Sequence, residues 1–369
     1  MDRFSPVHFM FLMLGVGIVS LKTYPRIYLV NGQRNTWIAL IISSIIIFFI
    51  FTYIIKIWKK DNSKYNKSIV DIYQCALGKK LGNIFLALFI LTLFLTLIES
   101  STVEADSMHQ NMLIETPKWV FLLFFIVPSI YIVRKNIVAI FTITMIGIVL
   151  IMIAGINLGI LTISYKQSSL LFPVFENGLD INFFISIIEI LGLYGCINIT
   201  LPFLSKISHN KGKLMKYAII GLIIIIQIEI VGITGILMTF TPERAISMNY
   251  PKLQQTQLVS FFQFLDFGEL YVMLQILGGF LLKYMLAFYS ILIILRDYNI
   301  SRRSLKILTV LISIVVLICS IIISTNSFII FDLLNIYQYI CLFNFIIVPL
   351  IVFIIIDIKN NFKLNHLRK

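Results

Sequence analysis

Charged side chains are scarce in this chain of 369 residues, of which Asp, Glu, Lys and Arg together make up only 13%. Soluble globular domains carry about 25% charged residues, so this shortage excludes an ordinary water-soluble fold. The chain is instead 59% hydrophobic, with a mean hydropathy of +0.97. This composition predicts an all-α integral membrane protein.

Cysteine and histidine are also scarce, with four of each. The cysteines are far apart in the sequence, which argues against a disulfide framework and against a CxxC metal site. The histidines lie near the ends of apolar runs or in loops, and the patterns HExxH, G-x-S-x-G and GxxxxGK are absent. The sequence therefore predicts no enzyme, no metal and no cofactor.

Long apolar runs are abundant, and a helix needs about 20 apolar residues to cross a bilayer. Ten such runs lie between clusters of charge, and we expect each to be a transmembrane helix. Their predicted bounds are 7–30, 36–57, 82–106, 117–134, 136–162, 182–204, 216–240, 270–295, 304–325 and 332–357.

The net charge of +13 would indicate nucleic acid in a soluble protein, but here it reports topology. With the N-terminus inside, 22 of the 30 Lys and Arg residues fall in cytoplasmic segments and seven on the outer side. Lysine and arginine are enriched in cytoplasmic loops. We therefore expect both termini in the cytoplasm and no nucleic-acid partner.

Two predicted spans carry glycines near their middle. The first contains Gly15-Val16-Gly17, and the sixth contains Gly192-Leu193-Tyr194-Gly195 followed by Pro202. The first and sixth of ten spans correspond in transporters built from two inverted five-span repeats, which bind substrate at paired broken helices. We therefore predict substrate contacts at Gly15, Val16, Gly17, Gly192, Tyr194 and Gly195. Close packing of helices is the alternative interpretation of either glycine pair.

The same pattern predicts one transmembrane domain over residues 1–369. Its first repeat covers about 7–162, its second about 182–325, and the last span about 332–357.

Charges inside predicted spans are costly and therefore informative. Lys283 and Glu229 lie at mid-membrane depth, and Glu189 lies one to two turns outward of the glycines in the sixth span. Lys283 is a candidate to replace a coupling cation or to orient a substrate carboxylate, while Glu189 or Glu229 binds an ammonium or relays a proton. The alternative is a structural ion pair between Lys283 and Glu229.

Polar residues also gather at the two predicted outer boundaries of the first and third spans. Glu99 and Asp106 share one helical face, and Glu99 is placed near the outer boundary, where this cluster would border an external vestibule. The alternative for Glu104 and Asp106 is emergence into water. Lys22 and Arg26 are expected to reach the outer interface by extending along the lipid surface.

Two connections are more than turns. The segment 65–80 has the pattern of an amphipathic helix on the inner membrane surface. The outer loop 241–269 is either a cover over a vestibule or a solvated connector.

Several motifs resemble the B subunits of spore germinant receptors. The first is Gly15-Val16-Gly17-Ile18, followed by Pro25-Arg26, Gly32-Gln33 and Trp37-Ile38; the others are Ile69-Val70-Asp71-Ile72, Leu77-Gly78-Lys79-Lys80-Leu81-Gly82 and Leu201-Pro202. The ten-span layout and the length also fit. The segment Ser20-Leu21-Lys22-Thr23-Tyr24 is a departure, because it lengthens the spacing from the glycines to Pro25 and predicts a polar insertion in the site wall.

The resemblance implies the LeuT-like inverted-repeat fold of the amino acid/polyamine/organocation superfamily, with broken helices 1 and 6. It also implies a place in the inner membrane of the endospore, a larger A subunit and a lipoprotein C subunit as partners, and a small nutrient such as an amino acid as ligand.

Three functions follow as hypotheses. The first is a germinant-sensing subunit, the second a proton-coupled amino acid permease, and the third a water- or ion-conducting element of a larger complex.

Overall fold

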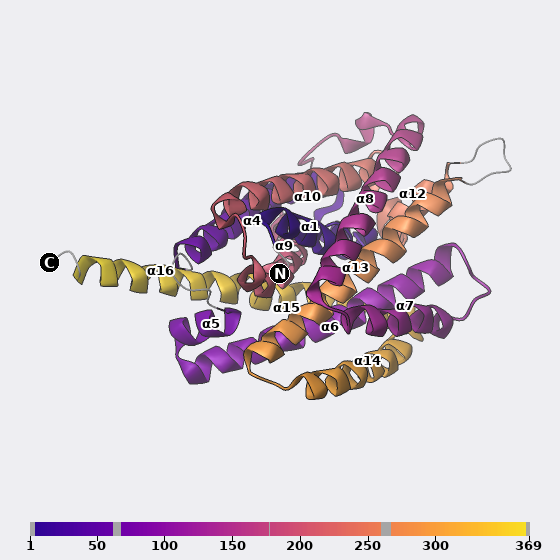
Figure 1. Ribbon diagram of the computed structural model, residues 1–369. Helices are drawn as coiled ribbons and strands as arrows, with labels where there is room; N and C mark the ends of the chain where they lie inside the picture. The colour runs from indigo at the N-terminus through magenta and orange to yellow at the C-terminus, as the bar shows by residue number, and fades with distance from the viewer. Residues whose placement is uncertain (1–3, 62–67, 177, 260–266, 367–369) are drawn as a thin grey trace.

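The computed structural model describes residues 4–61, 68–176, 178–259 and 267–366, which form helices and connecting turns and no β-strand (Figure 1). Within these ranges, nine helical segments are long and apolar enough to cross a membrane. The remaining predicted span is α7 (Lys118–Val133), an apolar helix of 16 residues with Pro128 in its interior. The protein is thus an all-helical integral membrane protein, and nine of the ten predicted spans are confirmed by length and composition.

The nine segments contain the following elements. In chain order they are α1 (Pro6–Gly17) with α2 (Ser20–Thr23), α3 (Arg26–Gly32) with η1 (Gln33–Asn35) and α4 (Thr36–Asp61), α6 (Lys79–Asn111), α8 (Ile137–Leu161), α9 (Ile181–Tyr194) with η4 (Gly195–Lys206), η5 (Lys211–Lys213) with α10 (Leu214–Leu237), α13 (Phe267–Asp297), α14 (Arg302–Ser324), and α15 (Ser327–Cys341) with η6 (Leu342–Ile347) and α16 (Val348–His366).

The first span lies at the centre of the bundle. Its helix α1 packs against α8, α10, α13 and the 3₁₀ helix η4, and Figure 1 shows it near the middle of the molecule, beside α10 and α8. Leu14, Val16 and Leu21 of α1 and α2 are at most 2% exposed, whereas Met10 and Phe11 nearer the start of α1 are half-buried. A helix that is buried on most of its surface needs no polar face, which explains the apolar sequence of this span.

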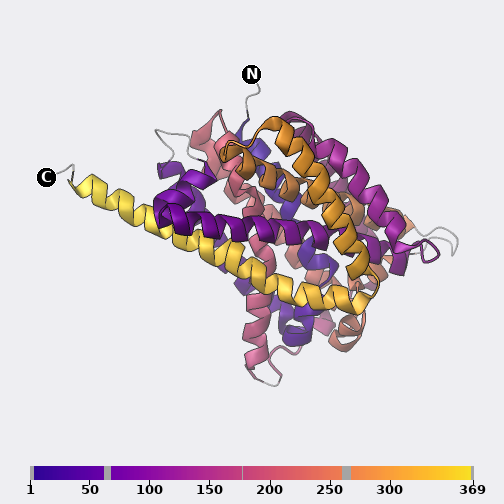
Figure 2. The same cartoon turned by 90° about the horizontal axis from the view of Figure 1, so that it is seen from below.

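The last span bends away from ideal geometry and then leaves the bundle. Between α15 and α16 the chain forms the π-helical segment η6, a conformation that is frequent at functional sites. Figure 2 shows α16 projecting beyond the body of the molecule toward the C-terminus.

The predicted amphipathic segment contains α5 (Ile69–Leu77), which begins at the cap formed by Ser68 and Asp71. Its apolar residues are buried against α6 and α16. The apolar face of α5 is therefore covered by protein. Gly82 makes the contact with α6 close, since a Cβ there would lie 2.8 Å from the carbonyl oxygen of Tyr73. Residues 65–67 of the predicted segment lie outside the described residues.

The connections predicted to lie on the outer side contain short helices, namely η2 (Ile163–Tyr165), η3 (Ser168–Leu171), α11 (Pro242–Ser247) and α12 (Pro251–Gln257). Helix α12 packs on α10 and α13, with Tyr250, Leu253 and Gln255 buried. The described part of loop 241–269 is therefore a folded cover and not a solvated connector. Residues 260–266 of that loop lie outside the described residues.

Candidate functional site

Both glycine-containing spans change conformation where their glycines lie. Helix α1 ends at Gly17, residues 18 and 19 form a bend, and α2 begins at Ser20. In the other span, α9 ends at Tyr194 and the chain continues as the 3₁₀ helix η4 from Gly195. The two altered segments are buried, and α1, η4 and α13 contact one another. Irregular backbone at membrane depth is tolerated where protein covers it.

A buried ion pair lies beside these breaks. The Nζ atom of Lys283 on α13 is 2.8 Å from Oε2 of Glu99 on α6, and neither side chain is exposed to solvent. Lys283 also donates a hydrogen bond to the Ser20 hydroxyl. The second carboxylate oxygen of Glu99 accepts a hydrogen bond of 2.7 Å from Tyr24, and Ser100 donates to Oε2 at 2.9 Å. Each charge thus has polar partners in addition to its counterion, as a buried pair requires.

An aromatic residue of the last span completes this cluster. The Tyr337 ring on α15 faces the Lys283 ammonium, with 5.6 Å from Nζ to the ring centroid, which is within cation–π range. The Tyr337 hydroxyl lies 2.9 Å from the Thr96 hydroxyl and 3.5 Å from the Cys196 thiol, the second residue of η4. The cluster therefore connects α2, α6, α13, α15 and η4. We call Ser20, Tyr24, Glu99, Lys283 and Tyr337 the ion-pair cluster.

Sequence reasoning identified only the two charges of this cluster. The signal for Ser20 and Tyr24 was present, because both belong to the polar segment that lengthens the first span before Pro25. The structure forms that segment into α2 and the turn after it, and its polar groups contact the ion pair. Tyr337 gave no signal, because one tyrosine in an apolar run does not reveal its neighbours.

Glu229 does not pair with Lys283. It is fully buried on α10, and neither of its carboxylate oxygens accepts a hydrogen bond from the described residues. Its electrostatic neighbour is Lys22, whose stem covers Gly232 one turn along α10. The predicted alternative of a Lys283–Glu229 ion pair is therefore wrong. Lys283 on α13 faces Glu99, whereas Glu229 on α10 faces Lys22.

The burial of Lys22 also differs from what was predicted. Its side chain is only 8% exposed, so it does not extend to the outer interface. Arg26 donates to the Asn249 side chain and stacks on Phe331 at 5.3 Å.

Glu189 belongs to a separate network. Its carboxylate accepts hydrogen bonds from Asn31 at 2.9 and 3.0 Å and from Tyr339 at 2.9 Å. Tyr194, one and a half turns further along α9, shares a hydrogen bond of 2.8 Å with Ser44. Glu189 is thus held by α3 and α15, and it is not the partner of Lys283.

The predicted glycines bring neighbouring helices close together. A Cβ on Gly15 would lie 2.8 Å from Leu286, and one on Gly17 would lie 2.7 Å from Ile225. At Gly195 the nearest atoms belong to Ile346 and Cys341, while a Cβ on Gly192 would collide with the Gln338 carbonyl oxygen. Val16, between Gly15 and Gly17, is fully buried. Close packing therefore explains why these positions have no Cβ atom. The backbone groups of the glycines lie at or beside the helix breaks.

The acidic end of α6 is also covered by protein. Glu99, Glu104 and Asp106 are at most 1% exposed, so the expectations of an acidic vestibule border and of emergence into water are wrong. Helical spacing gives the depth of a residue along its axis, but not the neighbours that cover it.

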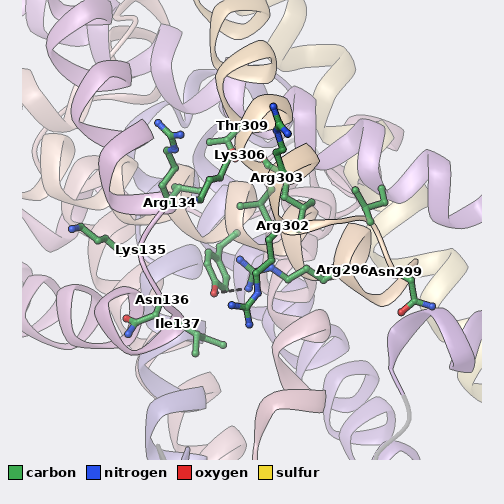
Figure 3. A pocket seen from close by; sticks show the side chains of 15 residues that line it. Arg134, Lys135, Asn136, Ile137, Arg296, Asn299, Arg302, Arg303, Lys306 and Thr309 are labelled. Carbon is green, nitrogen blue, oxygen red and sulfur yellow. Dashed lines mark hydrogen bonds between the residues drawn. The ribbon is translucent and has the colours of Figure 1, made fainter.

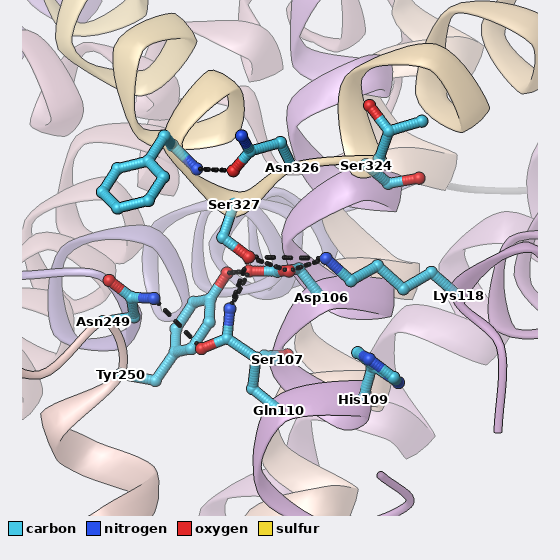
Figure 4. Close-up of polar contacts among 12 residues, drawn as sticks. Asp106, Ser107, His109, Gln110, Lys118, Asn249, Tyr250, Ser324, Asn326 and Ser327 are labelled. Carbon is cyan, nitrogen blue, oxygen red and sulfur yellow. Dashed lines mark hydrogen bonds and ion pairs between the residues drawn. The ribbon is translucent and has the colours of Figure 1, made fainter. Parts of the chain in front are cut away.

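Asp106 makes the largest set of contacts at this end. Figure 4 shows its carboxylate held by Lys118 at 2.6 Å, Tyr250 at 2.6 Å, Ser327 at 2.8 Å and Gln110 at 3.0 Å. These partners come from α7, the loop before α12, α15 and α6 itself. The carboxylate therefore fixes four separate segments at the predicted outer side.

The fold defines the class of protein. The structure is similar to the crystal structure of MhsT in complex with L-phenylalanine, with a TM-score of 0.61 and 12% identity over 97% of this chain and 99% of that one. The protein is thus an integral membrane protein with the LeuT fold of transporters.

The sequence comparisons give the family. The profile of the spore germination protein family matches residues 4–328, and the chain belongs to that family. It is 22% identical to spore germination protein XB of Bacillus anthracis over 324 residues, which cover 86% of this chain and 87% of that relative. The resemblance found in the sequence motifs is therefore confirmed.

Proposed function

We propose that this protein is the nutrient-sensing B subunit of a germinant receptor, in the inner membrane of the endospore and with both termini in the cytoplasm. The observation that carries the proposal is the buried Lys283–Glu99 ion pair beside the two broken helices. Membership of the spore germination protein family supports the biological role. The transporter fold supports two inverted repeats, 7–162 and 182–325, in one domain with the last span at 332–357.

The ion pair matches the charges of a small amino acid. A zwitterion carries one carboxylate and one ammonium, so it can insert between a separated Lys283 and Glu99 and give each charge a new partner. Bound in this way, the ligand replaces the interaction it breaks, and no buried charge is left alone. Ser20 and Tyr24 then either donate their hydrogen bonds to the ligand or keep their present hydrogen bonds with Lys283 and Glu99.

The helix breaks supply the remaining ligand contacts in this proposal. The backbone leaves the α-helical pattern between Gly17 and Ser20, and after Tyr194 it continues in the tighter 3₁₀ pattern of η4. Gly15, Val16, Gly17, Gly192, Tyr194 and Gly195 form these segments and bind the ligand through their main chain, while the missing Cβ atoms of the glycines allow the surrounding helices to close.

Ligand binding becomes a signal through the difference between two conformations. In the described conformation the ion-pair cluster is closed, and its residues connect spans from both halves of the chain. A ligand that separates Lys283 from Glu99 favours a conformation in which α13 and α6 are differently placed. The A subunit and the lipoprotein C subunit read this shift by binding the two conformations unequally.

The test measures binding of an amino acid panel to the purified chain in lipid nanodiscs. A bound amino acid raises the thermal unfolding temperature in proportion to its occupancy, and Lys283→Gln and Glu99→Gln abolish this rise. Lys206→Gln is the matched control, because it removes a different ion pair, the one of 3.3 Å with Asp297 at the C-terminal end of α13. Spores that carry Lys283→Gln lose the germination response while the protein still reaches the membrane.

Retained binding in both variants of the central pair would overturn the ligand site. Normal germination in spores that carry them would overturn the receptor role of the pair.

One observation favours a proton-coupled amino acid permease as the second candidate. Glu229 is a buried carboxylate without a hydrogen bond from the described residues, which is the environment of a group that exchanges protons. In this function Lys283 replaces a coupling cation, and Glu229 or Glu189 relays the proton. Labelled amino acid uptake into proteoliposomes that depends on a pH gradient and is lost in Glu229→Gln supports it. Absence of uptake across the panel that binds the chain excludes it.

A further inference from the structure

The most basic cavity of the protein has an ordinary explanation. It measures about 860 Å³ and lies between the α7–α8 and α13–α14 connections, and Figure 3 shows six cationic side chains around it. These are Arg134, Lys135, Arg296, Arg302, Arg303 and Lys306. They lie in exposed segments on the predicted cytoplasmic side, where lysine and arginine are generally enriched in membrane proteins.

A smaller cavity on the opposite side has no such explanation. It measures about 310 Å³ and lies between α8 and α10. Three lysines line it, namely Lys22 of α2, Lys166 of the loop between η2 and η3, and Lys252 of α12. Only seven Lys and Arg residues are assigned to the outer side, so three of them converge from separate segments on one cavity. Topology alone disfavours cations on this side.

The charges of these lysines are poorly balanced within the protein. Lys22 is 8% exposed, and its ammonium group forms neither a hydrogen bond nor an ion pair with the described residues; its contact with Glu229 is through the backbone and at longer range through charge. Lys166 donates to the Gly159 carbonyl oxygen at 3.4 Å, and Lys252 donates to Gln255 at 2.7 Å. Glu229 is the one carboxylate that interacts electrostatically with Lys22, and one negative charge does not offset three positive ones.

Repulsion between these lysines has a measurable consequence. Burial and the neighbouring Lys22 and Lys166 ammonium groups lower the pKa of Lys252 to about 7. Burial also lowers the pKa of Lys166. An anion in the cavity would offset this repulsion, because an opposite charge at short range favours the charged form of each lysine.

The rest of the cavity wall is apolar and continues to the lipid-facing surface. Ile151, Ile224 and Ile228 line it, and so do Ile156 and Val231, which are 62% and 53% exposed on the outside of α8 and α10. A ligand that enters between these two helices therefore meets hydrocarbon-like side chains first and the lysines at the end.

We propose that this cavity, the three-lysine pocket, binds an amphipathic anion, with the acidic head group at Lys22, Lys166 and Lys252 and the hydrocarbon tail between α8 and α10. An anionic phospholipid of the outer leaflet and a free long-chain fatty acid share this chemistry. The pocket contains no residue of the ion-pair cluster, so this proposal does not depend on the function proposed above.

The experiment uses the full chain in nanodiscs with a photoactivatable phosphatidylglycerol whose reactive group is on the acyl chain. Light attaches the probe to peptides that contain Ile151–Gly159 of α8 or Ile224–Gly232 of α10, and mass spectrometry locates it. Lys166→Gln and Lys252→Gln each reduce this labelling about five-fold, since one lysine near an anionic head group contributes roughly this factor. Lys252→Arg restores the labelling, and Arg244→Gln, which removes a cation of α11 outside the pocket, leaves it unchanged.

Competition identifies the source of the anion. Displacement by unlabelled phosphatidylglycerol but not by a fatty acid supports a lipid ligand, whereas stronger displacement by the fatty acid supports a free acid. Displacement by inorganic phosphate as effective as by either amphiphile overturns the proposal, because the tail then contributes nothing. Equal labelling by a zwitterionic phosphatidylcholine probe overturns it too, as does labelling that both glutamine variants leave unchanged.

Discussion

Lys283 and Glu99 lie 2.8 Å apart with no solvent exposure, and they join α13 to α6 at the depth where the first span is broken. Lys283 also donates a hydrogen bond to Ser20 of α2, and Glu99 accepts one from Tyr24, so the pair fixes the part of the span that follows the break. A buried ion pair is expensive to desolvate. The protein thus keeps a costly interaction at the point where two halves of the fold meet.

The first prediction is that loss of one charge of this pair is more damaging than loss of both. Lys283→Met leaves Glu99 buried without a counterion, and Glu99→Gln does the same to Lys283, so each single variant loses about 3–5 kcal/mol of stability. The double variant Lys283→Met/Glu99→Gln recovers much of this loss. Thermal unfolding of the four proteins in detergent gives the coupling free energy. Additive losses would show that the two side chains do not interact.

A second prediction concerns the contact between α9 and α15. Gly192→Ala places a Cβ against the Gln338 carbonyl oxygen, and backbone gives way less easily than a flexible side chain. We expect this variant to lose about 1–3 kcal/mol, as overpacked cores typically do, and to fall at the upper end of that range because the obstacle is backbone. Gly159→Ala is the control, since nothing lies within 4 Å of a Cβ there and alanine favours a helix.

Equal unfolding temperatures for the two alanine variants would contradict the close approach at Gly192.

A third prediction tests the network at Asp106. Asp106→Asn removes the negative charge that faces Lys118 and weakens the hydrogen bonds from Tyr250 and Ser327. Because hydrogen bonds to charged groups contribute about 1.5–3 kcal/mol each, we expect a loss of at least about 2 kcal/mol. Hydrogen exchange should show faster opening of α12 and of the start of α15. Glu115→Gln, an exposed carboxylate on the same side, should change neither quantity.

Periodicity and charge predicted the helical class, nine of the ten spans and the two breaks from the sequence. They predicted poorly which side chains meet, as Lys283 illustrates: its partner is Glu99, which was expected nearer the outer boundary, and not Glu229. Counting residues gives a position along one helix, whereas partners depend on how several helices are shifted and rotated against one another. The burial of Asp106 was missed for the same reason, because α12 and α15 cover it from distant parts of the chain.

The last prediction is a pH dependence of stability caused by Lys252. Its pKa falls from the ordinary 10.5 to about 7 in the folded protein, because of burial and of the nearby Lys22 and Lys166. Below pH 7 the folded and unfolded chains both carry the proton, and the charge destabilises the folded state. Between about 7 and 10.5 the unfolded chain binds more protons than the folded chain, so stability rises with pH.

Lys252→Gln removes this dependence, so the variant is more stable than the parent near pH 6, and its advantage shrinks as the pH approaches about 9. Thermal unfolding in lipid-free detergent across this range measures the difference. Arg244→Gln should differ from the parent by a constant amount, because a guanidinium stays protonated throughout. A constant difference for Lys252→Gln as well would contradict the lowered pKa. An anionic amphiphile in the three-lysine pocket should raise the pKa of Lys252 again, and its addition should therefore flatten the pH dependence of the parent protein.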